Sequence, residues 1–303
     1  MKHSAATIAL RASTKTLWII VMTVFGFVFA YPFIYGLLAS LMLQKEYGFQ
    51  GSMLAIPTAP TLQNYAKFMT LNNAGAIGPF FNSVGRAAWA TFVVCSVSVL
   101  VGYPLARYEF KIKKAVIIGI VAAQVIPGVL TMIPSFLLVS RIPFVGGNNW
   151  AGFGGRGLIN NKLMLFLPLG WGVLLWAFLF MQAIKGFPRS FEEAAEIDGY
   201  GFWSILLKIV LPMQGPILAV IAINTALGSW NDWLTPFLYI NRPGDSTLAG
   251  WLGTLIANLG RSGIPDYPRV YALGTLTIIP PFVIFLIFQK HIIQGISSVG
   301  IKG

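Results

Sequence analysis

Charged residues are scarce in this sequence. They make up 10% of its 303 residues, whereas 56% of the residues are hydrophobic. An average soluble domain is about 25% charged. Because a soluble fold needs a polar exterior, it could not cover this much apolar surface, whereas a lipid bilayer accepts it. The apolar segments run evenly from end to end, so we expect one all-α membrane domain over residues 1–303.

Cysteine and histidine are also rare. Cys95 is the only cysteine, which excludes an internal disulfide, and its apolar surroundings are typical of a small core or lipid-facing residue. His3 and His291 lie near opposite ends of the chain. No ligand spacing of a zinc site exists, so we expect no bound metal.

Long apolar segments predict the membrane topology, because a spanning helix needs about 20 mainly apolar residues. Six segments qualify, roughly 17–40, 83–106, 115–140, 163–184, 214–240 and 271–289. Prolines interrupt the third and polar residues dot the fifth, but neighbouring helices can satisfy the backbone groups that such breaks release. The first segment is longer than the apolar region of a signal peptide, and no convincing cleavage site follows it. We therefore interpret it as an uncleaved span.

Basic residues predict the orientation, since short cytosolic loops are enriched in Lys and Arg. With both termini in the cytosol, 12 of the 21 basic residues lie inside. Four of them fall within the eight residues 107–114, between two spans. The net charge of +12 therefore reflects topology. The basic residues are spread over many loops and form no nucleic-acid-binding module.

Three outer connections follow from this topology, at about 41–82, 141–162 and 241–270. The second is rich in glycine over 144–157, but no Gly-Lys-Ser/Thr sequence follows and no strand precedes it. We interpret it as a flexible outer loop rather than a phosphate-binding loop.

The cytosolic loop 185–213 carries four of the nine acidic residues. Ser190 and Glu193 have the spacing of a capping box, which predicts a helix start, and Gly199 can end that helix. A second, apolar helix should follow and stop before Pro212. From these patterns alone, the pair is either a connector on the membrane surface or a docking element.

This loop resembles the EAA loop of ATP-binding-cassette (ABC) importer permeases. In that motif Glu-Ala-Ala is followed after three residues by Gly, after nine more by Ile, and after one more by Leu-Pro. The matching residues are Glu193-Ala194-Ala195, Gly199, Ile209 and Leu211-Pro212. Further positions resemble the carbohydrate subgroup of these permeases, whose maltose-type subunits have six spans. They are Asp198, Pro216, the segment 230–236 and the C-terminal segment 294–303. Tyr200-Gly201 departs from the usual small residues, and the loop 144–157 is longer than is common.

The resemblance implies an ABC importer type I permease fold in a bacterial plasma (inner) membrane. Two permease subunits would enclose a pathway, an external solute-binding protein would deliver the carbohydrate, and two cytosolic ATPase subunits would bind ATP and Mg. This chain would be non-catalytic and hold no cofactor, since it lacks a Walker A lysine motif. Through Glu193, Ala194, Ala195, Asp198 and Gly199, its loop would transmit ATPase closure to the spans.

Other functions fit the sequence less well. A secondary transporter needs intramembrane ionisable residues, for which Asp232 is the one serious candidate, and it would leave the EAA loop unexplained. A membrane enzyme needs a nucleophile paired with a base, but His3 and His291 are placed at the cytosolic membrane edge and no paired carboxylates lie within a span. Oligosaccharide is the leading cargo, while a monosaccharide or glycerol phosphate stays open.

The fifth predicted span carries the candidate pathway. Asn224 and Asn231 are seven residues apart, close to two helical turns, and so lie near one face. Asp232 should face protein or water rather than lipid. Three aromatic residues supply rings of the kind that stack on sugars: Trp230, Trp233 and Tyr239. The same residues could instead hold helices together or form an interfacial aromatic belt.

Two further segments are candidates for contact with partners. Arg242, Arg261 and Tyr267 lie in the outer connection 241–270, which the resemblance places near the binding protein; a plain linker is the alternative. The C-terminal tail, about 290–303, is too polar to span and is expected to reach the ATPase pair or to be a frayed terminus.

Overall fold

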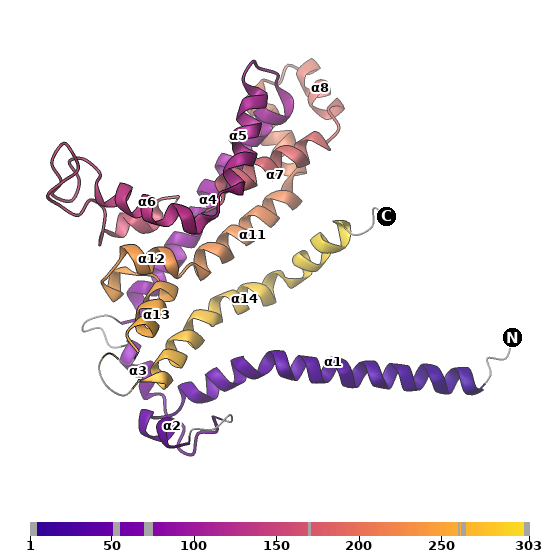
Figure 1. The fold of residues 1–303 in the computed structure, drawn as a ribbon. Coiled ribbons are helices and arrows are strands. Elements are labelled where there is room, and N and C mark those ends of the chain that lie inside the picture. Colours follow the sequence, from indigo (N-terminus) through magenta and orange to yellow (C-terminus); the bar gives the residue numbers. More distant parts are fainter. Residues whose placement is uncertain are drawn as a thin grey trace. The chain divides into compact units, whose positions relative to one another are not determined.

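The computed structural model contains helices and no strands among the residues that it describes, which confirms the all-α prediction (Figure 1). These residues are 5–50, 55–69, 75–168, 171–259, 261 and 265–299. The chain forms two compact units, Met1–Met69 with Asn258–Ile279 and Thr70–Ala257 with Pro280–Gly303. That the units form a single membrane domain stays a prediction.

The first unit contains α1 (Ala5–Ser40), α2 (Gln44–Gln50), α3 (Gln63–Met69) and the start of α14 (Tyr267–Val299). The end of α1 is fixed by Asn64, which is buried and donates to the carbonyls of Ser40 at 2.9 Å and Met42 at 2.8 Å. The most apolar part of α1 is not buried within the chain. A helix of this kind faces lipid or another subunit.

The second unit is organised around α4 (Ile77–Arg107), which packs against α7 (Val173–Lys185) and α11 (Gly215–Asn231). Gly102 permits the contact with α7, since a Cβ at this position would lie 2.7 Å from the Ala177 carbonyl oxygen. The other elements are α5 (Lys113–Val125), α6 (Gly128–Ser140), η1 (Lys162–Phe166), α8 (Ser190–Ile197), α9 (Phe202–Ile205), η2 (Leu206–Val210), α10 (Leu211–Met213), α12 (Leu234–Tyr239), η3 (Pro243–Asp245) and α13 (Leu248–Ala257).

The spans are less regular than the sequence predicts. Within the described residues, three helices are long and apolar enough to cross a membrane, or up to five if each bent pair is one span. α5 and α6 meet at 99°, and Pro127, one of the two prolines expected to interrupt this span, lies at the break. The predicted span 163–184 differs most: it begins as the 3-10 helix η1, and its α-helix, α7, has 13 residues. Such a helix is about 20 Å long, short of the ~30 Å hydrocarbon core.

The glycine-rich segment after α6 is a hydrogen-bonded loop, although the sequence analysis interpreted it as flexible. Asn148 is buried and donates to the carbonyls of Ser140 and Ile142, both at 2.9 Å, while its Oδ1 accepts from the Gly155 amide at 2.9 Å. Five glycines over 146–157 have positive φ, which lets the backbone fold tightly around this amide. The glycines therefore allow this loop to fold compactly.

Candidate functional site

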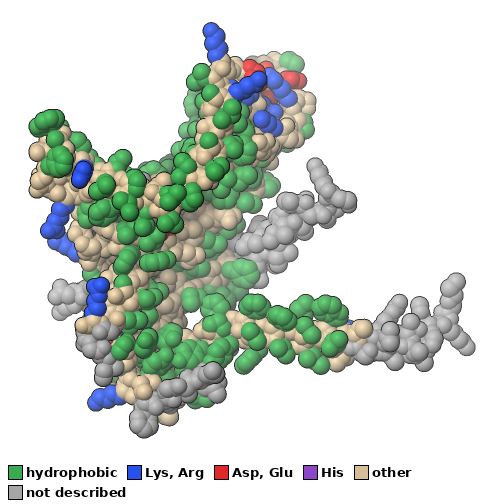
Figure 2. All heavy atoms as spheres, in the orientation of Figure 1, with side chains coloured by type: hydrophobic (Ala, Val, Ile, Leu, Met, Phe, Trp, Pro, Cys, Tyr) green, Lys and Arg blue, Asp and Glu red, His purple; other side chains and the backbone are tan. Residues whose placement is uncertain are grey.

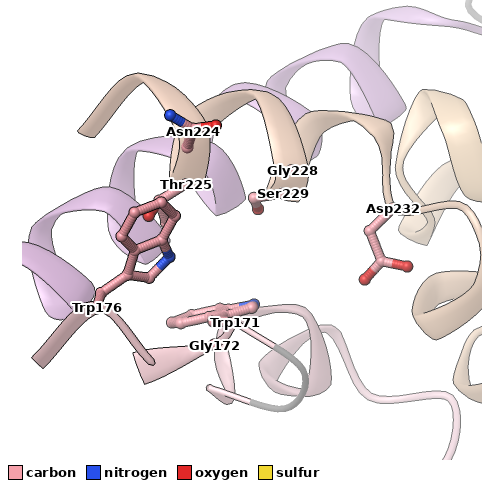
Figure 3. A pocket seen from close by; sticks show the side chains of 8 residues that line it. All are labelled: Trp171, Gly172, Trp176, Asn224, Thr225, Gly228, Ser229 and Asp232. Atoms are coloured by element: carbon pink, nitrogen blue, oxygen red, sulfur yellow. The ribbon is translucent and has the colours of Figure 1, made fainter. Parts of the chain in front are cut away.

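A polar pocket of about 270 Å³ lies between α11 and the start of α7 (Figure 3). Its lining residues are Trp171, Gly172, Trp176, Asn224, Thr225, Gly228, Ser229 and Asp232. Thr225, Ser229 and Asp232 follow one another at four and three residues, so they share one face of the helix. On the other side, Gly172 with a φ of +64° turns the chain into α7 and so presents both tryptophans to the pocket.

An ion pair between a buried arginine and the partly buried Asp232 borders this pocket. Arg86 on α4 is fully buried, and its Nη2 donates to Asp232 Oδ2 at 2.6 Å. Its Nε and Nη1 donate to the carbonyls of Leu165 and Ser229, both at 3.1 Å. Asp232 Oδ1 accepts from the amide of Thr235, at the start of α12, at 3.1 Å. The pair thus joins α4, η1, α11 and α12.

The three candidate pathway residues separate in the structure. Asn224 and Asp232 line the pocket, whereas Asn231 is exposed and does not. Asn224 and Asn231 therefore do not line the pocket together, and the α11 residues that line it beside Asn224 are Thr225, Gly228, Ser229 and Asp232. Asn224 donates from Nδ2 to the Val220 carbonyl of its own helix at 2.9 Å. Asp232 faces protein, as its charge requires.

The helix α8 of the EAA-like loop ends in a Schellman motif. The Tyr200 amide donates to the Ala195 carbonyl at 2.9 Å, and the Gly199 amide donates to the Glu196 carbonyl at 3.0 Å. Gly199 has a φ of +81°, which a residue with a side chain rarely adopts. The predicted end of the helix at Gly199 is confirmed.

The predicted capping box does not form. α8 begins with Arg189 as its N-cap, no side chain caps it there, and Glu193 is exposed, with one oxygen 3.5 Å from Arg189 Nε. The second helix also differs, because it continues through Pro212 to Met213. The π-helix η2 precedes this proline, and its wider turn shifts hydrogen bonds to the fifth residue, so the missing amide of Pro212 is tolerated.

Glu192, rather than Glu193, attaches α8 to the core. It is buried and accepts from Tyr103 at 2.9 Å and from Arg107 Nε at 2.7 Å. Arg107 also donates to the Phe187 carbonyl at 2.9 Å. Both partners of Glu192 belong to α4, so these contacts join α8 to a long helix of this unit.

The rest of the loop divides into an inner and an outer face. Ala195 is 5% exposed and packs in the core with Phe202 nearby, so a larger side chain there would clash within the chain itself. Ala194 and Asp198 are exposed, and Ile197 is 87% exposed. Trp203 and Leu207 add exposed apolar side chains on the second helix. Basic and acidic side chains gather around α8 (Figure 2).

The outer candidates lie in different units. Arg242 is exposed just before η3 in the unit that contains the pocket. Arg261 and Tyr267 belong to the other unit. Arg261 donates to Asn258 Oδ1 at 3.2 Å, and the ring of Tyr267, which is 41% exposed, lies 5.7 Å from that of Tyr47. α14 continues to Val299, and residues 300–303 of the predicted tail lie outside the described residues.

Sequence reasoning missed several contributors to these sites, among them Arg86, Glu192, Trp171 and Thr225. Trp171 and Thr225 lie in apolar segments without a motif, so only the folded chain brings them together. Glu192 immediately precedes Glu193 of the motif, and the sequence offers no signal for which of the two is buried. Arg86 did offer a signal, as a charged residue inside a predicted span.

Comparison with known proteins gives consistent matches. Residues 97–298 match the family described as "binding-protein-dependent transport system inner membrane component". The arabinooligosaccharides transport system permease protein AraQ of Halalkalibacterium halodurans is 30% identical over 283 residues, which cover 92% of this chain and 93% of that protein. The multiple sugar-binding transport system permease protein MsmG of Streptococcus mutans is 29% identical and covers 93% and 95%. A chain of a bacterial ABC transporter that imports the acidic polysaccharide alginate has the same fold, with a TM-score of 0.71, 19% identity, and coverage of 96% of this chain and 99% of that one.

Proposed function

Since the chain belongs to the family of binding-protein-dependent transport system inner membrane components, we propose that it is the permease subunit of an ATP-driven carbohydrate importer. It forms half of the translocation pathway and transmits closure of the ATPase subunits through α8. The observation that carries this proposal is the construction of α8. Its inner side is bound to α4 through Glu192, and its outer side is exposed for a partner.

This construction suits a mechanical joint. A partner would bind the outer face of α8, which carries Ala194, Ile197 and Asp198, and its movement would displace the helix. The buried Glu192 carboxylate of this helix accepts hydrogen bonds from Tyr103 and Arg107 of α4. Because the charged pair of Glu192 and Arg107 is buried, separating it is costly, so α4 follows the movement of α8. Rigid-body movement of this kind can alternate access to a pathway.

The complete importer contains a second permease subunit, two ATPase subunits that bind ATP and Mg, and an external solute-binding protein. This chain binds neither ATP nor metal and catalyses no reaction. It crosses the bacterial inner membrane six times with both termini in the cytosol. Arg242, Arg261 and Tyr267 face the binding protein, and the tail 290–303 reaches the ATPase pair. The names of the relatives, which transport arabinooligosaccharides and multiple sugars, support an oligosaccharide as cargo over a monosaccharide or glycerol phosphate.

Reconstitution tests the proposal. The chain is assembled in nanodiscs with its sister permease and ATPase, and ATP hydrolysis is measured with and without the binding protein loaded with arabinotriose or raffinose. We expect hydrolysis to rise several-fold with the loaded binding protein. Equal hydrolysis in both conditions, or uptake into proteoliposomes driven by an ion gradient without ATP, would contradict an ATP-driven importer.

A further inference from the structure

The pocket between α7 and α11 contains three buried polar atoms without a partner among the described residues. They are the indole nitrogen of Trp171 and the hydroxyl oxygens of Thr225 and Ser229. The three residues are 7%, 5% and 6% exposed, and all three line the pocket. A buried polar group without a hydrogen bond costs free energy, so such groups are rare and call for an explanation. Three around one pocket indicate a ligand that supplies the hydrogen bonds.

The pocket also offers aromatic surface. The rings of Trp171 and Trp176 lie opposite α11, from which Ser229 and Asp232 extend toward them (Figure 3). Indole faces bind the C–H groups of a sugar ring, and the indole N–H and the hydroxyls can bond with its hydroxyl groups. At about 270 Å³, the pocket lies just below the ~300–1,000 Å³ of typical small-molecule sites. This size suits one sugar ring rather than a chain of rings.

The charge of the pocket limits the ligand further. No Lys, Arg or His is among its lining residues, and its one acidic residue, Asp232, is paired with Arg86. A phosphate or uronate would therefore meet a carboxylate and no free cation there. A neutral ligand meets no uncompensated charge.

We propose that this pocket is a subsite for one ring of a neutral sugar, stacked on Trp171 and hydrogen-bonded by Thr225 and Ser229. The inference rests on the proposed importer function and deepens it. It gives this chain direct contact with the cargo, and it disfavours glycerol phosphate.

Thr225→Val is the sharpest test, because it keeps the shape of the side chain and removes an unpartnered hydroxyl. Trp171→Phe likewise keeps a ring and removes the indole N–H. In the complete importer in proteoliposomes, uptake of labelled arabinotriose and raffinose is measured over a range of sugar-loaded binding protein. We expect each variant to raise the half-saturation concentration about 3- to 10-fold. Thermal stability should be unchanged or higher, since a buried unsatisfied group is lost.

Thr91→Val is the matched control, because the Thr91 hydroxyl donates to the Ala87 carbonyl of its own helix at 2.8 Å, outside the pocket. It should leave uptake unchanged. If the wild-type importer takes up sugar and both pocket variants match it, the pocket is only a hydrated cavity and the inference is wrong while the proposed function stands. If the wild type imports neither sugar and ATP hydrolysis does not respond to them, the proposed substrate class fails, and the subsite falls with it.

Discussion

Replacing Asp232 with leucine removes the only carboxylate that contacts the Arg86 guanidinium among the described residues. Arg86 is 0% exposed, and its remaining acceptors are the carbonyls of Leu165 and Ser229. Asp232→Leu therefore leaves a charge buried without compensation. We expect it to destabilise the importer before it affects any step of transport.

The size of the expected loss of stability follows from the burial of Arg86. Removing one partner of a buried ion pair costs about 3–5 kcal/mol, whereas replacing both partners by apolar residues is often close to neutral. At about 2 °C of Tm per kcal/mol for a long chain, Asp232→Leu should lower the apparent Tm by roughly 6–10 °C. The double variant Arg86→Met with Asp232→Leu should recover most of that loss. It should not recover all of it, because two carbonyls lose their donor.

The assay heats the complete importer and follows the fraction that stays monodisperse on size-exclusion chromatography, detected through a fluorescent tag on this chain. Transport by the double variant is measured on the surviving complex. If the double variant is as unstable as Asp232→Leu alone, the unpaired charge of Arg86 is not the cause, and the reasoning is refuted. Normal uptake by a stable double variant would show that the Asp232 carboxylate is not needed in the pathway.

Three further predictions concern glycines and the attachment of α8. Gly199→Val should cost about 1–3 kcal/mol of stability and uncouple ATP hydrolysis from uptake, whereas Gly199→Asn, which tolerates positive φ, should retain most coupling. Gly102→Ala should lower thermal stability by about 1–3 kcal/mol through its clash with α7, while Gly119→Ala, with open space around it, should be neutral or stabilising. Glu192→Gln should weaken stimulation of ATP hydrolysis by the binding protein at least as much as Glu193→Gln, because only Glu192 is buried against α4.

Much of the fold was accessible from the sequence because lipid imposes a simple rule. Every backbone polar group must be satisfied within the membrane, so long apolar segments become helices. The EAA spacing likewise predicted the helix that ends at Gly199, since a Schellman motif needs a residue that adopts positive φ. These features depend on local sequence, and they are the ones the structure confirms.

Features that depend on which helix faces pack against one another could not be predicted from the sequence. The capping box at Ser190 was wrong because the chain turns into the helix one residue earlier, at Arg189. Apolar periodicity could not show that Ala195 faces inward, since both faces of the loop carry apolar residues. The pocket depends on Trp171, which is distant in sequence from Thr225 and Ser229. Only the packing of α7 beside α11 brings them together.

The Arg86–Asp232 pair, in contrast, could have been inferred from the sequence alone. Arg86 and Asp232 are the only charged residues within the six predicted spans. A lone charge in a span costs roughly 2.5–3.5 kcal/mol near the helix centre, and intramembrane charges of opposite sign commonly pair. With one cation and one anion available, the pairing is unique. The same argument places the second and fifth predicted spans side by side, which is where the structure has α4 and α11. In an apolar chain, scarcity of charge thus becomes information about contacts, because each buried charge has few partners to choose from.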